Sequence, residues 1–307
     1  MTYLNNLQVI LALFIPLFLG IFLYRKKLVD SDFPKGLSNY LFYIALPCTI
    51  ISSMQFDIGF AEFASSLPLI LTGVAITFAC WGLAKLTAPL VEKDRKKRRL
   101  IEYSFMFCNF AYTGYPILEN LYGKESLFYA SIFNIGLFVL TVTVGTYVIK
   151  RAGADEAVSH VSWKDVLSPP FLSLFVGIAL MLLPIRMPMF LDQSIHVIAA
   201  TTTPMALLMT GMIIARERAF DWKNWKVFFI CLFRLLLIPI GLLLLLKAFG
   251  CSGPSLYVPV ILMANPVAVN IVLFAETYGA PSDEAANIVV WSSVLSIFTI
   301  PLVNLLI

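Results

Sequence analysis

Two interrupted apolar segments constrain the fold of this chain more than any other feature. One contains residues 109–116 (NFAYTGYP) and the other residues 264–270 (ANPVAVN). Proline removes a backbone donor and clashes with the carbonyl four residues earlier, so a helix kinks or breaks there. Backbone that leaves the helix at membrane depth is tolerated only where protein buries it or where it lines a polar cavity. Two such breaks in corresponding halves of a chain indicate the binding site of a secondary transporter.

The composition predicts a membrane protein. Of 307 residues, 60% are hydrophobic and only 13% are charged, whereas soluble domains are about 45–50% apolar and about 25% charged. The longest polar stretch, residues 150–165, is too short to form a core of its own. The net charge of +4 is explained by basic loops at one membrane face, so we expect no nucleic-acid partner.

Ten segments are apolar enough to be membrane spans, which need about 20 residues each. We therefore predict an all-α polytopic membrane protein in which the fourth and ninth of ten transmembrane helices are broken. The expected spans are approximately 7–24, 34–54, 63–83, 101–122, 126–148, 171–183, 195–215, 227–249, 256–278 and 285–306.

Lys and Arg in the loops predict the orientation, because cytoplasmic loops carry an excess of both. Most of them follow spans one, three, five and seven, as in the run 93–99. The opposite loops hold only Lys124, Arg186 and Lys247. We expect both termini outside, basic loops in the cytoplasm, and location in the cell inner (plasma) membrane.

A short internal repeat joins the two breaks. Asn109 precedes Gly123 by fourteen positions, and Asn265 precedes Gly279 by the same interval. In this register Gly114 is the counterpart of Asn270. Because each half would contain five spans, the second half enters the membrane from the opposite side. This predicts a 5+5 inverted repeat, which is typical of secondary carriers.

These residues resemble a known family. Phe107-Cys108-Asn109 leading to Gly114-Tyr115-Pro116, and Asn265-Pro266-Val267-Ala268-Val269-Asn270 leading to Thr277-Tyr278-Gly279, are similar to the auxin efflux carrier family in its bacterial branch. The length, the ten spans and the polar middle linker also fit. The plant branch has a long central loop that this chain lacks, so plant-type substrates and phospho-regulation are not carried over.

The resemblance implies a PIN-type fold, related to bile-acid sodium symporters. Residues 1–149 would form the first five-helix repeat, 150–165 a cytoplasmic linker and 166–307 the second repeat. Spans one, two, six and seven would be a scaffold, also used for a homodimer, and the others a moving transport domain. Spans four and nine would cross at Pro116 and Pro266 beside the substrate. That substrate would be a small organic anion such as an auxin-like acid, malate or malonate.

The candidate substrate-binding residues lie at or near these breaks. Amino-terminal N–H groups of a half-helix offer partial positive charge to an anion. The amides of Asn109, Asn265 and Asn270 could bind a carboxylate there or only cap exposed backbone, and Gly114 belongs to the same site. Pro116 and Pro266 would shape the break without touching substrate.

Two further polar residues lie inside spans. Asn134, midway along span five, could line the cavity or form an interhelical hydrogen bond. Arg234 lies about 12 Å into span eight, counted from Lys226 at 1.5 Å per residue. It could attract an anion or reach back to the cytoplasmic face, and we expect the second.

No Asp or Glu lies near the middle of a span, although proton and sodium carriers commonly place one there. The protein is then either a uniporter or a symporter whose sodium or proton is held by carbonyls and amides. An enzyme would need paired aspartates or a Ser/His pair at depth, and we expect neither catalysis nor a metal or other cofactor. A receptor would normally add a soluble output domain.

Overall fold

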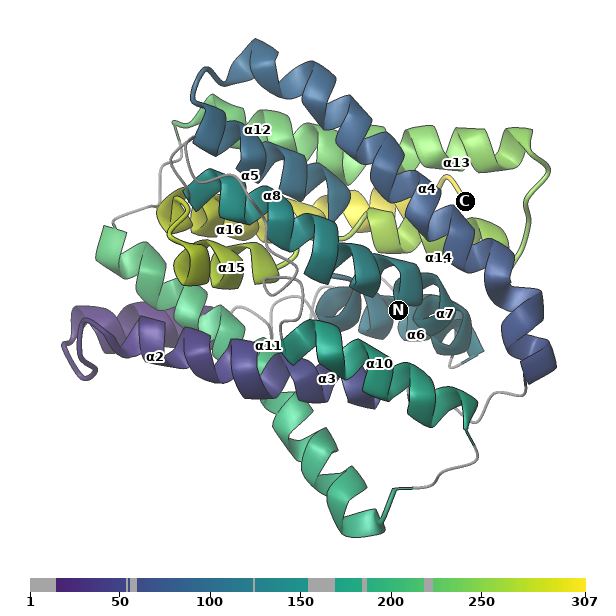
Figure 1. Cartoon of the computed structure of the whole chain (residues 1–307). Helices are drawn as coiled ribbons and strands as arrows, with labels where there is room; N and C mark the ends of the chain where they lie inside the picture. The colour runs from purple at the N-terminus through teal and green to yellow at the C-terminus, as the bar shows by residue number, and fades with distance from the viewer. Residues whose placement is uncertain are drawn as a thin grey trace.

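The computed structural model describes residues 15–53, 55, 60–123, 125–153, 169–183, 187–217 and 223–307. Within these residues the regular structure is helical, apart from one isolated β-bridge (Figure 1). The first helix covers Ile15–Arg25. The others are α2 (Phe33–Tyr40), α3 (Leu46–Ser53), α4 (Phe60–Val91), α5 (Arg95–Met106), α6 (Tyr115–Tyr122), α7 (Glu125–Leu140), α8 (Thr146–Gly153), α10 (Pro169–Leu182), α11 (Met189–Glu217), α12 (Trp225–Leu232), α13 (Ile238–Ala248), α14 (Pro254–Met263), α15 (Asn270–Tyr278) and α16 (Ser282–Asn304).

Five of the helical runs are long and apolar enough to cross a membrane. They cover Leu67–Val91, Glu125–Gly153, Met189–Ile213, Trp225–Ala248 and Ser282–Asn304. The other predicted segments contain helices that are shorter or divided, as at α5–α6 and α14–α15. These findings support a polytopic membrane protein. The linker predicted at 150–165 lies mostly outside the described residues, and α8 continues through its first four positions.

In the described ranges, four π-helical turns interrupt the helices: η1 (Leu41–Ala45), η2 (Phe110–Gly114), η3 (Thr141–Gly145) and η4 (Phe233–Leu237). The turns η1, η2 and η4 each end two residues before a proline, at Pro47, Pro116 and Pro239 respectively. Because proline lacks an N–H and its ring crowds the preceding turn, a wider turn accommodates it without ending the helix. η3 has no such proline.

The helices pack in two groups. The helix at Ile15–Arg25 and α2, α3, α10 and α11 form one group, seen in the lower part of Figure 1. The helices α4–α8 and α12–α16 form the other, in which α4 packs on α5 and α7, and α15 packs on α8 and α16. Contacts of α11 with α16, and of α2 with α15, join the two groups.

Two glycines allow the closest approach inside the first group. A Cβ atom on Gly20 would collide with the carbonyl oxygen of Leu208 in α11, and a Cβ atom on Gly211 would collide with the carbonyl oxygen of Leu17. The two helices therefore cross with backbone against backbone. Small residues at such crossings are common between membrane helices.

Polar contacts join the two groups at α15. Arg216 in α11 forms two hydrogen bonds with the carboxylate of Glu276, at 3.0 and 3.1 Å. The hydroxyls of Ser38 in α2 and Thr277 lie 3.2 Å apart. Within the second group, Lys226 at the start of α12 pairs with Glu92, just after α4, at 2.7 Å.

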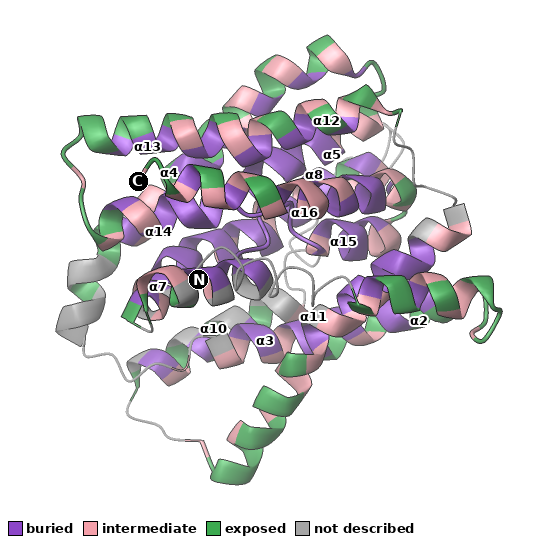
Figure 2. Cartoon of the chain, turned by 180° about the vertical axis from the view of Figure 1, so that it is seen from behind, coloured by how far each residue is buried: buried purple, intermediate pink, exposed green. Residues whose placement is uncertain are grey.

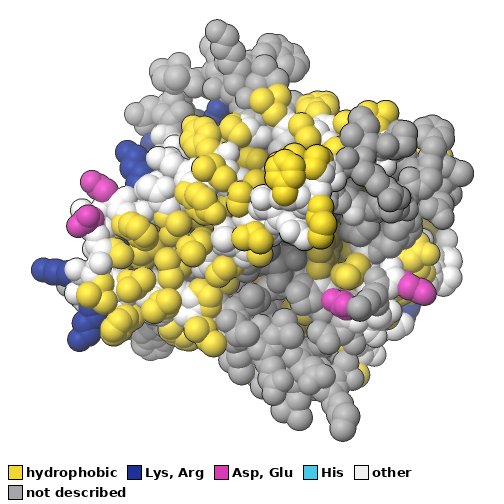
Figure 3. Space-filling model, turned by 90° about the horizontal axis from the view of Figure 1, so that it is seen from below, with side chains coloured by type: hydrophobic (Ala, Val, Ile, Leu, Met, Phe, Trp, Pro, Cys, Tyr) yellow, Lys and Arg dark blue, Asp and Glu magenta, His cyan; other side chains and the backbone are white. Residues whose placement is uncertain are grey.

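Buried residues lie mainly where helices face one another, whereas exposed residues mark the outer sides of α2 and α13 (Figure 2). Many exposed side chains are large and apolar, including Leu86, Leu90 and Phe249. On one face of the molecule many of the described side chains are hydrophobic, and a cluster of charged groups lies at one edge (Figure 3). Such a surface suits a lipid environment.

Candidate functional site

The two interrupted segments pair with each other. The chain is extended at Phe107, and Cys108 forms an antiparallel bridge with Val267. The Asn109 N–H donates to the Pro266 carbonyl at 2.8 Å, and the Ala268 N–H donates to the Phe107 carbonyl at 3.2 Å. These bonds satisfy backbone groups that the broken helices leave without partners.

The two breaks differ in their relation to proline. The chain leaves α14 immediately before Pro266, as expected. In the other segment the extended stretch comes at Phe107–Asn109, earlier than the break predicted at Gly114 and Pro116. Pro116 instead lies in the first turn of α6, after the π-helical turn η2. Because η2 runs directly into α6, Pro116 lies within one helical run, and the wider π-helical turn before it accommodates the proline.

Four helix ends converge on this pairing. The helices α5 and α14 end there, at Met106 and Met263, while η2 begins at Phe110 and α15 begins at Asn270. Carbonyl groups give a helix end partial negative charge, and N–H groups give a helix start partial positive charge. We call the place where these four helix ends meet the crossing. It therefore combines two negative helix ends, or poles, with two positive ones.

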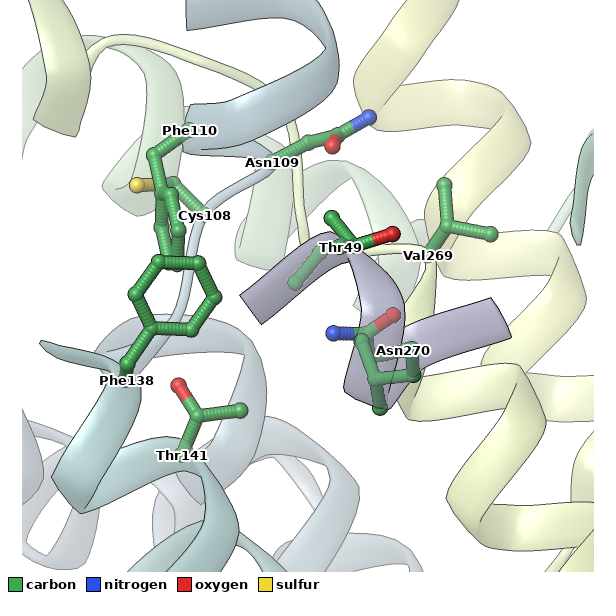
Figure 4. A pocket seen from close by; sticks show the side chains of 10 residues that line it. Thr49, Cys108, Asn109, Phe110, Phe138, Thr141, Val269 and Asn270 are labelled. Atoms are coloured by element: carbon green, nitrogen blue, oxygen red, sulfur yellow. The ribbon is translucent and has the colours of Figure 1, made fainter. Parts of the chain in front are cut away.

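A pocket lies on the side of the two helix starts (Figure 4). Its empty space is about 340 Å³, including the part that is open to the outside. Asn109 and Asn270 line it, together with Thr49 from α3 and Thr141 from η3. The other lining residues are Leu46, Cys108, Phe110, Phe138, Ala268 and Val269. Both helix groups thus contribute to one pocket.

The pocket has an aromatic wall and a polar wall. The rings of Phe110 and Phe138 meet edge to face, with centroids 4.9 Å apart. On the other side, Figure 4 shows Thr49, Asn109 and Asn270. The Thr49 hydroxyl lies 2.7 Å from that of Thr202 in α11, which holds it in place. An anion with an apolar body would find donors and apolar contacts here.

Asn265 and Gly114 are not among the residues that line this pocket. Asn265 is fully buried, and its Nδ2 donates to the Ile261 carbonyl at 2.8 Å, so it caps the end of α14. A Cβ atom on Gly114 would lie 2.7 Å from Leu262 Cδ2 and 3.4 Å from Asn265 Nδ2. Gly114 therefore permits close packing of η2 against α14.

Asn134 also lies away from the pocket. Its side chain is buried in α7, and Nδ2 donates to the hydroxyl of Tyr115 at 2.9 Å. This is the interhelical hydrogen bond that the sequence left as an alternative. Ser292 in α16 plays a similar part, because its Oγ accepts a hydrogen bond from the Val267 N–H at 3.1 Å.

The expectation that Arg234 reaches back to the cytoplasmic face is wrong. Its side chain is 0% exposed. The guanidinium donates to the Phe105 carbonyl at 3.3 Å and lies 3.9 Å from the Met263 sulfur. It therefore lies at the carbonyl end of α5 and contacts the side chain of the last residue of α14. Arg234 belongs to the π-helical turn η4, which places its side chain at this position.

Sequence reasoning missed Thr49, Phe138 and Thr141 as pocket residues. Threonine and phenylalanine are ordinary in apolar helices, so nothing in their spacing distinguishes them. Pro47 is a weak signal for Thr49, because the π-helical turn η1 ends just before this proline and π-helical turns often lie at functional sites. The pocket draws these residues from two separate predicted spans, 34–54 and 126–148, so only the fold shows that they meet.

Together, the apolar helices and the paired breaks define a multi-pass membrane protein with the features of a transporter. The chain matches the family described as "Membrane transport protein" over residues 7–304. It belongs to this family, the auxin efflux carrier family. The resemblance seen in its motifs is thereby confirmed.

Relatives carry transporter names. The chain is 23% identical over 306 residues to the uncharacterized transporter MJ1031 of Methanocaldococcus jannaschii, covering 96% of this chain and 97% of that protein. It is 19% identical over 278 residues to the uncharacterized transporter YfdV of Escherichia coli, with 88% and 87% covered. A match of 26% identity over 136 residues to the probable auxin efflux carrier component 9 of rice covers 41% of this chain and 32% of that protein.

Proposed function

We propose that the protein is a secondary transporter of a small organic anion, either an auxin-like acid or a dicarboxylate such as malate or malonate. The pocket at the starts of η2 and α15 carries this proposal, because it joins two positive helix ends with the amides of Asn109 and Asn270. Helix starts are ready-made anion sites. The amides would bind the carboxylate, and the rings of Phe110 and Phe138 would contact its apolar part.

We further propose an elevator mechanism. The helix at Ile15–Arg25 with α2, α3, α10 and α11 would be the scaffold, and α4–α8 with α12–α16 would be the moving transport domain. This division is supported by the packing within each group and by a pocket shared between Thr49 of one group and Asn270 of the other. We also propose a 5+5 inverted repeat, with residues 1–149 as the first repeat and residues 166–307 as the second. Pro116 and Pro266 would lie near the crossing.

The proposed setting is the cell inner (plasma) membrane, with both termini outside and basic loops such as 93–99 in the cytoplasm. Their Lys and Arg content supports this orientation. The scaffold helices would also form a homodimer. Proline residues would shape the backbone only, and we propose no catalytic step.

Solid-supported-membrane electrophysiology on the purified, reconstituted protein tests the function. The panel contains indole-3-acetate, malate, malonate and chloride, each with and without sodium and proton gradients. Currents that saturate with one carboxylate and fall sharply in both Asn109→Ala and Asn270→Ala are expected. Carboxylate currents that persist unchanged in both variants would contradict the site.

The same recordings separate the two transport modes. Currents that are indifferent to both gradients indicate uniport driven by the membrane potential. Currents that require a sodium or proton gradient indicate a symporter of the bile-acid symporter type, which is the alternative. Absence of any carboxylate current in wild-type protein, with intact folding and orientation, would contradict organic anion transport.

A further inference from the structure

Arg234 is a buried cation that has no acidic partner in the described part of the chain. Its side chain is 0% exposed, and the Nε–H has no hydrogen-bond acceptor. Among the residues that the structure describes, its partners include the Phe105 carbonyl, the Met263 sulfur and the Cys108 side chain, with no carboxylate in ion-pair range. A guanidinium stays charged in proteins, and an unpaired buried charge is strongly unfavourable. Something other than an ion pair must therefore offset it.

The helix ends offset part of this charge. Phe105 lies in the last turn of α5, and Met263 is the last residue of α14. The carbonyl ends of both helices carry partial negative charge, which favours a cation there. Because each helix end carries about half an elementary charge, the two ends offset about one charge at most. Part of their charge also acts on the other groups of the crossing. The guanidinium thus leaves a net positive potential around it.

Cys108 connects Arg234 with the pocket. Its side chain interacts with the Arg234 guanidinium, and the same residue lines the pocket beside Asn109. Arg234 therefore lies one side chain behind the pocket wall. Two unit charges about 10 Å apart, in surroundings with an effective dielectric constant near 20, attract strongly enough for a roughly tenfold effect on affinity.

We propose that Arg234 is a positioning residue with two roles: it holds the ends of α5 and α14 together, and its charge strengthens anion binding in the pocket from behind Cys108. This inference rests on the proposed function, because it assumes that the pocket binds an anion. The positive potential would act on every anion in the pocket, in proportion to the charge of the anion. A dianion should gain more than a monoanion.

A second position allows the charge to be neutralised while Arg234 stays in place. Cys80 in α4 is 4% exposed, interacts electrostatically with Arg234 and does not line the pocket. Cys80→Asp would put a carboxylate within electrostatic range of the guanidinium, and Cys80→Asn is a neutral control of the same shape. Arg234→Gln removes the charge, whereas Arg234→Lys retains it but cannot bridge both helix ends.

The test measures dissociation constants of indole-3-acetate and malonate by isothermal titration calorimetry on the purified full chain. The proposal predicts a dissociation constant about tenfold higher in Cys80→Asp than in Cys80→Asn for the monoanion, and up to about 100-fold higher for the dianion. Arg234→Gln should show a similar loss, with Arg234→Lys intermediate. If Arg234→Gln fails to fold, the Cys80 pair still decides.

Equal affinity in Cys80→Asp and Cys80→Asn would overturn the electrostatic role of Arg234 and leave only its contact with the helix ends. A loss that does not depend on ligand charge would also overturn it. Failure of the wild-type protein to bind either anion would overturn the proposed function and this inference together. Binding by the wild type with no difference within the Cys80 pair would overturn this inference alone.

Discussion

Asn265 and Asn270 are five residues apart and have different surroundings. Asn270 lines the pocket at the first position of α15, whereas Asn265 is fully buried and caps α14 through the Ile261 carbonyl. The same side-chain chemistry thus supports binding at one position and backbone satisfaction at the other. The difference follows from which end of a half-helix each residue occupies.

Replacement of Asn265 by Ala should reduce stability without changing anion affinity. The loss of the buried hydrogen bond from Nδ2 to the Ile261 carbonyl is expected to cost about 1 kcal/mol. Thermal unfolding of detergent-purified protein would show the lower midpoint, and calorimetric titration would show an unchanged dissociation constant. A large loss of affinity at preserved stability would instead place Asn265 in the binding site.

Among single residues, the sequence could identify the polar groups but not their directions. Asn109, Asn265, Asn270 and Asn134 all stand out as amides inside apolar segments. Which amide faces the pocket depends on the rotation of each helix, and neighbours such as Tyr115 decide it. Arg234 was placed wrongly for a related reason: the helix ends that offset its charge come from two distant segments.

At the scale of elements, the crossing of the first helix and α11 depends on two glycines. Gly20→Ala and Gly211→Ala should each separate the two backbones, because the added Cβ atom meets a carbonyl oxygen. We expect a loss of about 2 kcal/mol or more for each. Thermal unfolding is the measurement.

Gly241→Ala in α13 is the matched control, because a Cβ atom there would have nothing within 4 Å. Alanine is a better helix former than glycine by about 1 kcal/mol. This control should therefore leave the unfolding midpoint unchanged or raise it. A similar loss in all three variants would show that the close approach of Gly20 and Gly211 has no special importance.

The ion pair between Glu92, after the end of α4, and Lys226, at the start of α12, should depend on pH. Burial acts to raise the pKa of Glu92, but hydrogen bonds from Lys226 and the Asp94 amide prevail and hold this pKa below its ordinary value of 4.5. The ionised form is thus favoured in the folded state. The contribution of ionised Glu92 to the free energy of unfolding is fully present above pH 4.5 and is lost as the pH falls through the lowered pKa.

Glu92→Gln should therefore lower the unfolding midpoint at neutral pH, and the difference from wild type should shrink as the pH falls below about 4.5. Unfolding curves across this range would show it, with Glu119→Gln at an exposed position as control. A difference that stays constant down to acid pH would mean that Glu92 acts through packing instead of charge.

Much of the element pattern could be predicted. The apolar segments correspond to helices, and the helix break at Pro266 could be located from proline. The extended stretch before Pro116 could not, because a π-helical turn accommodates this proline and moves the break to Phe107–Asn109. The proline that follows three of the π-helical turns also marks ordinary helix kinks, so it does not identify such a turn. The bridge between Cys108 and Val267 has no signature within one segment.

At the scale of the whole molecule, the proposed elevator mechanism would require α2 and α15 to move past each other. The hydroxyls of Ser38 and Thr277 lie 3.2 Å apart, on the two helix groups. A disulfide between Ser38→Cys and Thr277→Cys should therefore stop transport, and reduction should restore it. Each single cysteine variant controls for effects of the substitutions, and steady currents in the oxidised double variant would contradict the motion.

The membrane class and the family follow from features that are spread over the whole chain. Hydropathy, segment number and the paired motifs survive small errors at individual residues, so both could be inferred before the fold was known. The pocket could be predicted only in part. Asn109 and Asn270 come from recognisable breaks, but Thr49 reaches the pocket from the other helix group.

The most direct test of the account is binding of the transported carboxylate to Asn270→Asp, measured by isothermal titration calorimetry. The change keeps the shape of the side chain and puts a negative charge at the start of α15, with Asn39→Asp at an exposed position of α2 as control. The account predicts a dissociation constant raised about 100-fold in Asn270→Asp and unchanged in the control. Equal binding by both variants and the wild type would contradict an anion site at the crossing.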